Sequence, residues 1–569
     1  MLCGEDSHVR SHAAYPFKRT TFGCRHISPR KKECRLRKPK RQSFIYGTMI
    51  LLSAGIVNRM LGFIPRIILP RVIGAEGVGL YQLGYPFFLV LVTVITGGIP
   101  LAVAKMVAEA EGKGHPERSR RILHTALGIS ISLGILFTGI ALAGASWVSN
   151  VILTDSRVYY TFIAMIPMLT IVAVSAVYRG YFQGLQNMIP SALSSVLETV
   201  TRIFFMLWFS WQLLPKGIAF AAAGAMLGVT AGEITGMLVL LIQYYSALKK
   251  DKPEPDQQNG KPVEATKQDP ALGSAGRSGG ILRRLLGISV PVTAGRLVGS
   301  FSYLLESIIT ARSLAMAGIA TSMATAQYGS LQGMVIPLLL LPGALTTALA
   351  VSLVPSLSEA SARRDLKAIH KRIHQALRLA MVTGAPFAVL MYVLAVPLCT
   401  LLYGSSDTAP MLRMMAPFAL FLYVQAPLQA VLQAMDRPGT ALINTLIGAT
   451  VKILLILSLA SRPEYGINGA LIAIIANSIL VTLLHGYSVV KLISLRLKLN
   501  DLLKTGAAMT IMGAGVKYIY THISIAEAQW MQFLFASALG MALYLGISLL
   551  TGLFSRRDLE RIPLIGRWL

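Results

Sequence analysis

Charged side chains inside long apolar stretches are the residues of this sequence with the clearest capacity for chemistry. A charge in the middle of an apolar, membrane-length segment is costly, so it usually faces a partner or a water-filled cavity. The residues of this kind that could line a binding site are Arg59, Arg66, Arg296, Glu306, Glu198, Arg202, Arg312 and Lys452. Their types predict recognition of a charged ligand, and we expect no catalytic residue among them.

Arg59 and Arg66 form the strongest candidate pair for a ligand site. They are seven residues apart, which places both on one face of a continuous helix, about two turns from each other. Arginine suits phosphate because its planar guanidinium donates two parallel hydrogen bonds. We therefore predict a cationic cavity for a phosphate or pyrophosphate group, to which Arg296 and Glu306 contribute from a later helix. The alternative interpretation is that these side chains form local salt bridges or anchor the helices at the membrane surface.

The other charges and the absence of two motifs argue against a metal site, an ATPase and enzymatic activity. Glu198 and Arg202 are four residues apart, so in a helix they neutralise each other, and this spacing favours a structural role. His370 and His374 share that spacing, but the basic residues between them argue against a metal site. The sequence contains neither a G-x-x-x-x-G-K-[S/T] phosphate loop nor an H-E-x-x-H motif. We expect no ATPase, no cofactor, no metal and no enzymatic activity.

The composition excludes a water-soluble protein. Hydrophobic residues make up 54% of the 569 residues, and charged residues only 14%, against about 25% in soluble domains. Apolar stretches recur from Phe44 nearly to the end, and each could cross a hydrocarbon core as a helix, which needs roughly 20 residues. The net charge of +28 is concentrated in the first forty residues and in short connecting segments. This distribution indicates membrane topology rather than nucleic-acid binding.

We predict an all-α membrane protein of about fourteen transmembrane helices. The predicted spans are 44–71, 79–109, 122–149, 158–184, 189–214, 217–247, 282–312, 325–356, 372–402, 411–434, 440–461, 466–494, 502–522 and 530–554. The predicted parts are a disordered basic cytoplasmic tail (1–43), an N-terminal six-helix bundle (44–247), a cytoplasmic linker (248–280), a C-terminal six-helix bundle (281–494), two extra helices (495–555) and a basic cytoplasmic tail (556–569). The first tail sets topology, or results from a start codon assigned too far upstream.

The connecting segments alternate between rich and poor in basic residues. Lys113 and Arg118 follow the second predicted span, and Arg556 follows the last, whereas the loop after the ninth span has Asp407 alone. Because basic loops stay on the cytoplasmic side, both termini are predicted to be cytoplasmic, and the number of spans to be even. We expect a multi-pass monomer in the cell membrane, surrounded by the lipid bilayer.

The two predicted bundles resemble each other in sequence. Matches at an offset of 250 residues include Pro167 with Pro417 and Arg202 with Lys452, and at an offset of 240, Ile68 with Ile308. Six helices per copy is an even number, so the copies are predicted to be parallel and related by an axis along the membrane normal. Duplicated halves around a midplane site are typical of alternating-access transporters.

The stretch 58–66, Asn-Arg-Met-Leu-Gly-Phe-Ile-Pro-Arg, resembles the first-helix signature of the multidrug/oligosaccharidyl-lipid/polysaccharide exporter superfamily, in its polysaccharide-transporter and lipid II flippase branches. The runs Gly-Leu-Tyr-Gln at 79–82 and Gly-Ile-Pro-Leu-Ala-Val-Ala-Lys at 98–105 are similar to the stage V sporulation protein B family. The resemblance extends over 44–555. It implies two six-helix bundles that form a V-shaped cavity, plus two C-terminal helices that accommodate a lipid tail.

The resemblance also implies a substrate. Members of the superfamily branch flip undecaprenyl-linked sugars, and cavity arginines are thought to hold the pyrophosphate. The first signature arginine falls on Arg59, whereas Pro65 stands where the second is expected and Arg66 follows it. One residue turns a helical side chain by about 100°, so the geometry of the pyrophosphate site differs from the pattern.

Our hypothesis is a flippase for a polyprenyl-linked saccharide that works by alternating access, with a coupling cation or the membrane potential as the energy source. The resemblance to the stage V sporulation protein B family implies that the substrate is a peptidoglycan precursor for the spore cortex. Two alternatives stay open: a cation-coupled multidrug exporter of the same fold, and a non-transport membrane scaffold for cell-wall synthesis. The arginine-rich first helix argues against the first alternative, and the duplicated halves argue against the second.

Overall fold

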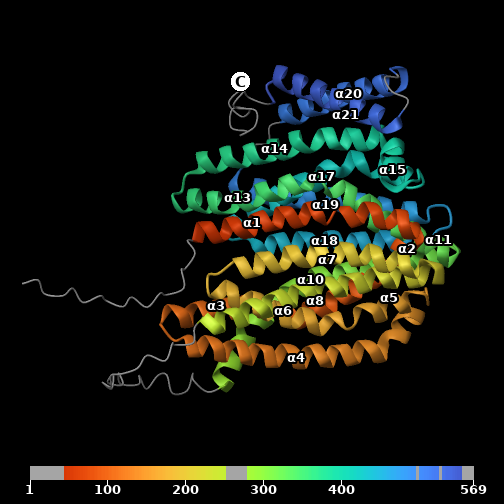
Figure 1. Ribbon diagram of the computed structural model, residues 1–569. Helices are drawn as coiled ribbons and strands as arrows, with labels where there is room; N and C mark the ends of the chain where they lie inside the picture. The colour runs from red at the N-terminus through yellow and green to blue at the C-terminus, as the bar shows by residue number, and fades with distance from the viewer. Residues whose placement is uncertain (1–43, 251–277, 495–498, 524–527, 554–569) are drawn as a thin grey trace, which may run out of the picture. The chain divides into compact units, whose positions relative to one another are not determined.

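The computed structural model describes residues 44–250, 278–494, 499–523 and 528–553. Every regular element in these ranges is helical, so the all-α prediction is confirmed (Figure 1). The two basic tails and most of the predicted linker lie outside the described residues. From residue 44 onward the described chain forms one compact unit, and the division into two separate bundles stays a prediction. We refer to residues 44–250 as the N-terminal half and to residues 278–493 as the C-terminal half.

The elements of the N-terminal half are α1 (Phe44–Leu61), α2 (Ile64–Thr96), α3 (Ile99–Gly112), α4 (Pro116–Trp147), the π-helical turn η1 (Val148–Ile152), α5 (Val158–Met165), α6 (Met168–Gly184), α7 (Ile189–Leu213), the 3-10 turn η2 (Leu214–Lys216) and α8 (Ile218–Lys250). The elements of the C-terminal half are α10 (Ser278–Met316), α11 (Thr321–Gly329), η3 (Ser330–Val335), α12 (Ile336–Leu340), α13 (Gly343–Ala362), α14 (Leu366–Val393), α15 (Ala395–Tyr403), α16 (Ala409–Met415), η4 (Ala416–Phe418), α17 (Ala419–Ala434), α18 (Pro438–Leu455), η5 (Ile456–Ala460) and α19 (Ile467–Ile493). The helices α20 (Leu499–His522) and α21 (Gln529–Leu550) follow.

The described helices include eleven stretches that could cross a membrane by length and composition, or up to twelve if one bent pair forms a single span. The stretch Met49–Gly112 has 64 residues, far more than the roughly 20 of one crossing. Within it, α2 changes direction at Gly74, whose φ of 68° and ψ of 178° lie outside the helical region. A multi-pass helical membrane protein is therefore confirmed, while the number fourteen and the repeat arrangement stay predictions.

Proline interrupts two of the predicted spans. The first helix ends at Leu61 and the next begins at Ile64, with Pro65 in its first turn. Because proline lacks an N–H, it cannot continue the hydrogen-bond ladder of the preceding helix. Arg59 and Arg66 thus lie on different helices, and the assumption that one continuous helix aligns them is wrong. The predicted span 325–356 is likewise a pair of helical segments, Thr321–Leu340 and Gly343–Ala362, which meet at an angle of 57° beside Pro342.

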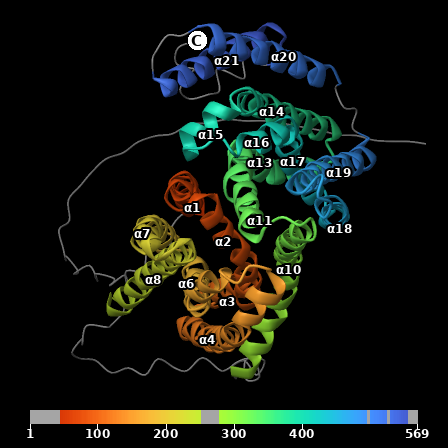
Figure 2. The same ribbon diagram turned by 90° about the vertical axis from the view of Figure 1, so that its right-hand side faces the viewer.

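Helix α10 packs against both halves (Figure 2). Near its start, Ile281 and Leu285 are fully buried in a core cluster with residues of α3, α4, α6 and α8. At the same end of the helix, Arg284 Nη2 pairs with Glu109 Oε2 at 2.5 Å. Toward its other end, Leu314 is buried in the core cluster of the C-terminal half. A helix that contributes to two cores provides a direct mechanical connection between them.

The C-terminal helix pair packs against α14, which lies beside it in both views (Figures 1 and 2). Met512 and Val516 of α20 and Tyr544 of α21 form a core cluster with Val382 and Val389 of α14. The Tyr544 hydroxyl also donates a hydrogen bond to the carbonyl of Val382 at 2.9 Å. This contact attaches the pair to the C-terminal half.

Two glycines allow α2 and α11 to touch across the halves. A Cβ atom on Gly79 would collide with the backbone of Thr325, and a Cβ atom on Gly329 would collide with the backbone of Ala75 and Gly79. Backbone atoms cannot move aside as flexible side chains can. The close approach of these helices therefore depends on the absence of side chains at both positions.

Replacing Gly329 with alanine is expected to destabilise the protein by about 1–3 kcal/mol, the usual cost of overpacking a tight contact. The measurement is thermal unfolding of the purified protein in detergent. Gly128→Ala is the matched control, because nothing lies within 4 Å of a Cβ atom built there. A Gly329→Ala midpoint as high as that of the control would contradict the contact.

Candidate functional site

Arg66 lies where residues of the two halves meet. Its side chain is exposed, and its charge acts on Tyr81 and Tyr85 of α2 and on Tyr303 of α10. The rings of Tyr81 and Tyr85 stack with their centroids 6.2 Å apart. The guanidinium therefore lies within electrostatic range of hydroxyl-bearing rings that both halves contribute.

Arg59, Arg66 and Arg296 share one property. All three side chains are exposed, and none of them forms a hydrogen bond or an ion pair with any residue that the structure describes. The N–H groups of their guanidinium groups are therefore available to donate hydrogen bonds to a ligand. The structure connects Arg66 with the tyrosines between the halves, but it shows no contact that brings Arg59 and Arg296 to that point.

Glu306 and Lys452, from α10 and α18, form a buried ion pair. Gln332 of η3 donates a hydrogen bond to the other carboxylate oxygen of Glu306 at 3.0 Å. The side chain of Glu306 is 9% exposed and that of Lys452 is 13% exposed. Each group compensates the other in a region that excludes water, so removal of one would leave a buried charge.

Glu198 is the centre of a second buried charge cluster, in the N-terminal half. Arg179 Nη2 of α6 approaches Glu198 Oε2 at 2.5 Å, and Arg202 Nη1 approaches Glu198 Oε1 at 3.6 Å. The spacing of Glu198 and Arg202 predicted their pairing, which is confirmed. The participation of Arg179 was not predicted, because that arginine comes from a different helix.

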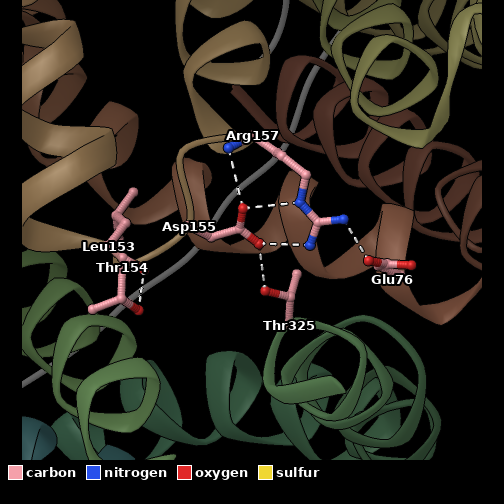
Figure 3. Close-up of polar contacts among 6 residues, drawn as sticks. All are labelled: Glu76, Leu153, Thr154, Asp155, Arg157 and Thr325. Atoms are coloured by element: carbon pink, nitrogen blue, oxygen red, sulfur yellow. Dashed lines mark hydrogen bonds and ion pairs between the residues drawn. The ribbon is translucent and has the colours of Figure 1, made fainter. Parts of the chain in front are cut away.

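A polar network joins the halves at the end that carries the loops around residues 155, 318 and 405 (Figure 1). We call Glu76, Asp155, Arg157 and Thr325 the interhalf network (Figure 3). Asp155 is 2% exposed, and it accepts a hydrogen bond from Thr325 Oγ1 of α11 at 2.8 Å. Arg157 donates to both carboxylate oxygens of Asp155, at 3.0 and 2.9 Å, and to Glu76 Oε1 at 2.5 Å. The hydrogen bonds with Asp155 raise the pKa of Arg157 above its ordinary value.

Two further contacts cross between the halves near this network. Arg312 of α10 donates to the carbonyl of Val151 at 2.8 Å. Arg71 of α2 donates to the carbonyl of Leu402 at 2.8 Å and also to that of Leu401. Arg312, which the sequence analysis named as a residue that could line a binding site, instead connects the two halves. The two halves are thus held together by charge-assisted hydrogen bonds at this end.

Sequence reasoning assigned Asp155 and Arg157 to a loop but gave them no partner in the other half. Asp155 and Thr325 are 170 positions apart in the sequence, and no local sequence pattern predicts a contact between residues so far apart. Glu76, Tyr81 and Tyr85 were also missed as site residues. An available signal was the unusual density of polar side chains in the 75–85 stretch of an otherwise apolar region.

The comparisons with known proteins cover nearly the whole chain. The family described as "Polysaccharide biosynthesis protein" matches residues 44–361, and the MatE family matches residues 300–457. Stage V sporulation protein B of Bacillus subtilis (strain 168) is 40% identical over 530 residues, which are 93% of this chain and 99% of the relative. The lipid II flippase MurJ of the same organism is 24% identical over 547 residues, covering 91% and 97% of the two chains.

A solved structure of a lipid II flippase MurJ, in an inward closed conformation, aligns with a TM-score of 0.63 at 15% identity. The alignment covers 88% of this chain and 98% of that structure. This likeness supports the fold alone. The family match over more than half of the residues and the 40% identical relative confirm the expected family. The chain belongs to the polysaccharide biosynthesis protein family, in the stage V sporulation protein B-like branch of the multidrug/oligosaccharidyl-lipid/polysaccharide exporter superfamily.

Proposed function

We propose that this protein flips an undecaprenyl-pyrophosphate-linked oligosaccharide, a peptidoglycan precursor, across the cell membrane by alternating access. The observation that carries the proposal is that three arginines of apolar helices, Arg59, Arg66 and Arg296, have no partner among the residues that the structure describes. An unpaired cation in such a place is costly, and a pyrophosphate would compensate several of them at once. The names of the relatives, a sporulation protein and a lipid II flippase, are consistent with a precursor of the spore cortex.

The proposed cycle begins with the cavity between the halves open to the cytoplasm, where both termini lie. The pyrophosphate binds the arginines, while the sugar stays in the hydrated cavity. The polyprenyl tail remains in lipid, alongside α20 and α21. Separation of the interhalf network then opens the other end and releases the head group outside. The protein works as a monomer in this proposal.

The test is a flipping assay with the full-length protein reconstituted in lipid vesicles. The substrate is an undecaprenyl-pyrophosphate oligosaccharide with a label that a membrane-impermeant reagent destroys. We expect label on the far leaflet to become accessible only in vesicles that contain the protein. Efflux of a cationic dye without lipid movement would favour the multidrug exporter, and movement of neither compound would favour the scaffold.

A further inference from the structure

A small cavity with charged walls lies beside the start of α10. Four of its seven lining residues are charged, and the other three are buried apolar residues of α3 and α4. The charged residues are Glu109 of α3, Lys113, Arg118 of α4 and Arg284 of α10. The 32 residues of α4, about 48 Å of helix, separate Lys113 from Asp155. The cavity therefore lies at the end of the molecule opposite to the interhalf network (Figure 1).

The charges of this cavity do not balance. Three positive groups face one carboxylate, which leaves an excess of two positive charges. Arg284 and Glu109 compensate each other through their ion pair at 2.5 Å. The side chains of Lys113 and Arg118 form no hydrogen bond or ion pair with any residue in the described part of the chain. Lys113 is exposed and Arg118 is half-buried, so both cations are available to an anion that enters the cavity.

The C-terminal half shows how the same spacing of charges is compensated elsewhere. Glu359 pairs with Arg363, four residues later on the same helix, at 2.8 Å. In the predicted repeat, at an offset of 250 residues, these two positions correspond to Glu109 and Lys113. Glu109 pairs instead with Arg284 of α10, so Lys113 lacks the partner that an i,i+4 spacing offers. The excess positive charge thus arises where α10 contacts the N-terminal half.

We propose that this cavity is an anion-binding site for a phosphate group, separate from the arginines of the proposed flippase cavity. A phosphate group is negatively charged and offers several acceptor oxygens. The guanidinium of Arg118 can donate two parallel hydrogen bonds to these oxygens, and the ammonium of Lys113 adds a compact positive charge. The cavity has a volume of about 40 Å³, room for about three water-sized groups. This size matches the oxygens of one phosphate group.

A phosphate group can reach the cavity from two sources. Basic pockets between membrane helices bind the head groups of anionic phospholipids, and this cavity lies where the candidate spans Met49–Gly112 and Pro116–Ile152 meet. Free phosphate in the aqueous phase would reach the same donors past the exposed Lys113. The recognition chemistry is the same in both cases, so the experiment has one arm for each source.

A bound phosphate group would connect three helices. Its donors come from α4 and from the end of α3, and Arg284 adds a positive charge from α10. A ligand favours the arrangement that brings its binding groups together. We therefore expect the bound anion to stabilise the attachment of the start of α10 to α3 and α4, and so to keep this end of the molecule closed.

The site can be tested without a transport substrate, with the full-length protein in a neutral detergent. One arm measures the binding of radiolabelled inorganic phosphate by equilibrium dialysis. The other arm measures the binding of a short-chain phosphatidylglycerol by calorimetric titration, with phosphatidylcholine as the counterpart without net charge. We expect saturable binding in at least one arm, and the arm that shows it identifies the source. Arg118→Gln should raise the Kd about tenfold, because it removes hydrogen bonds between charged groups.

Arg121→Gln is the matched control for Arg118→Gln. Arg121 is an exposed arginine three residues further along α4, it pairs with Glu117 at 3.9 Å, and it does not line the cavity. Its replacement should leave the Kd unchanged. Equal Kd values for the two variants, or no binding in either arm, would overturn the site. If Arg118→Gln does not fold, Lys113→Ala takes its place, because Lys113 is exposed, and the same comparison applies.

A further variant, Arg66→Ala, separates this site from the proposed flippase cavity. It should leave the Kd for the phosphate group unchanged, because Arg66 does not line the cavity beside α10. Loss of binding in Arg66→Ala, with normal binding in Arg118→Gln, would assign the anion to the other arginines and overturn the proposal.

The effect on α10 is measured by hydrogen exchange of its backbone amides. We expect exchange in residues 278–289 to slow when the binding anion is added to the unaltered protein or to Arg121→Gln. Arg118→Gln should show no such change at the same anion concentration. Binding without slower exchange would reject the proposed attachment of α10 by the anion. None of these measurements depends on lipid flipping, so failure of the proposed function and failure of this site are distinguishable.

Discussion

Replacing Arg66 with alanine is expected to raise the substrate concentration for half-maximal flipping by about ten- to a hundredfold. A hydrogen bond to a charged group contributes about 1.5–3 kcal/mol, and 1.4 kcal/mol is a factor of ten in affinity. Arg66 has no intramolecular partner among the described residues, so its removal breaks no salt bridge of the fold. The vesicle assay with labelled lipid-linked oligosaccharide measures the effect, with protein quantity normalised in each preparation.

Two further variants test whether the effect depends on the guanidinium group of Arg66. Arg66→Lys keeps the charge but lacks the planar fork, so it should recover only part of the lost affinity. Arg283→Ala is the matched control, because Arg283 is an exposed arginine of α10, the helix that also carries Arg296. Unchanged flipping by Arg66→Ala at normal protein levels would reject the role of this arginine in binding. Equal losses in Arg66→Ala and Arg283→Ala would point to a general effect of cationic charge.

A covalent link between positions 155 and 325 is expected to abolish flipping. The Asp155 and Thr325 side chains are in direct hydrogen-bonding contact across the halves, so cysteines at both positions can be joined by a disulfide or a short bifunctional reagent. Alternating access requires the interhalf network to separate once in each cycle. The experiment uses protein in which Cys3, Cys24, Cys34 and Cys399 are replaced by alanine.

The matched control is a cysteine pair at Thr138 and Thr170. Their hydroxyls are also in contact, at 3.2 Å, but both residues belong to the N-terminal half. Linking them should leave flipping unchanged, and reduction of a 155–325 disulfide should restore it. Full flipping by protein that is quantitatively linked at 155–325 would show that this end stays closed throughout transport.

The intramembrane charges form two groups: the two buried charge clusters, and the three arginines for which the described residues provide no partner. Glu306 with Lys452 and Glu198 with its arginines are internally compensated, so they can remain in an apolar interior without a ligand. Arg59, Arg66 and Arg296 have no such compensation within the described part of the chain. This difference, rather than their positions in the sequence, distinguishes charges that stabilise the fold from charges that are free to bind an anion.

Lys452 and Arg202 occupy equivalent positions in the predicted repeat, yet they pair differently. Arg202 pairs with Glu198 on its own helix, whereas Lys452 pairs with Glu306 on another helix. The spacing of four residues predicted the pairing of Arg202 with Glu198. The pairing of Lys452 with Glu306 depends on how α10 and α18 pack, and no feature of the separate segments predicts it.

The amino-acid pattern was enough to predict a multi-pass helical membrane protein of the exporter superfamily and to identify the charges that lie in its membrane segments. These properties are local, because each apolar run must become a helix that satisfies its own backbone in lipid. It took the three-dimensional structure to show that a break beside Pro65 separates Arg59 from Arg66, that Asp155 meets Thr325, and that Glu306 pairs with Lys452. Such contacts join segments far apart along the chain. They depend on helix directions and on glycine contacts between backbones, which hydropathy and spacing do not encode.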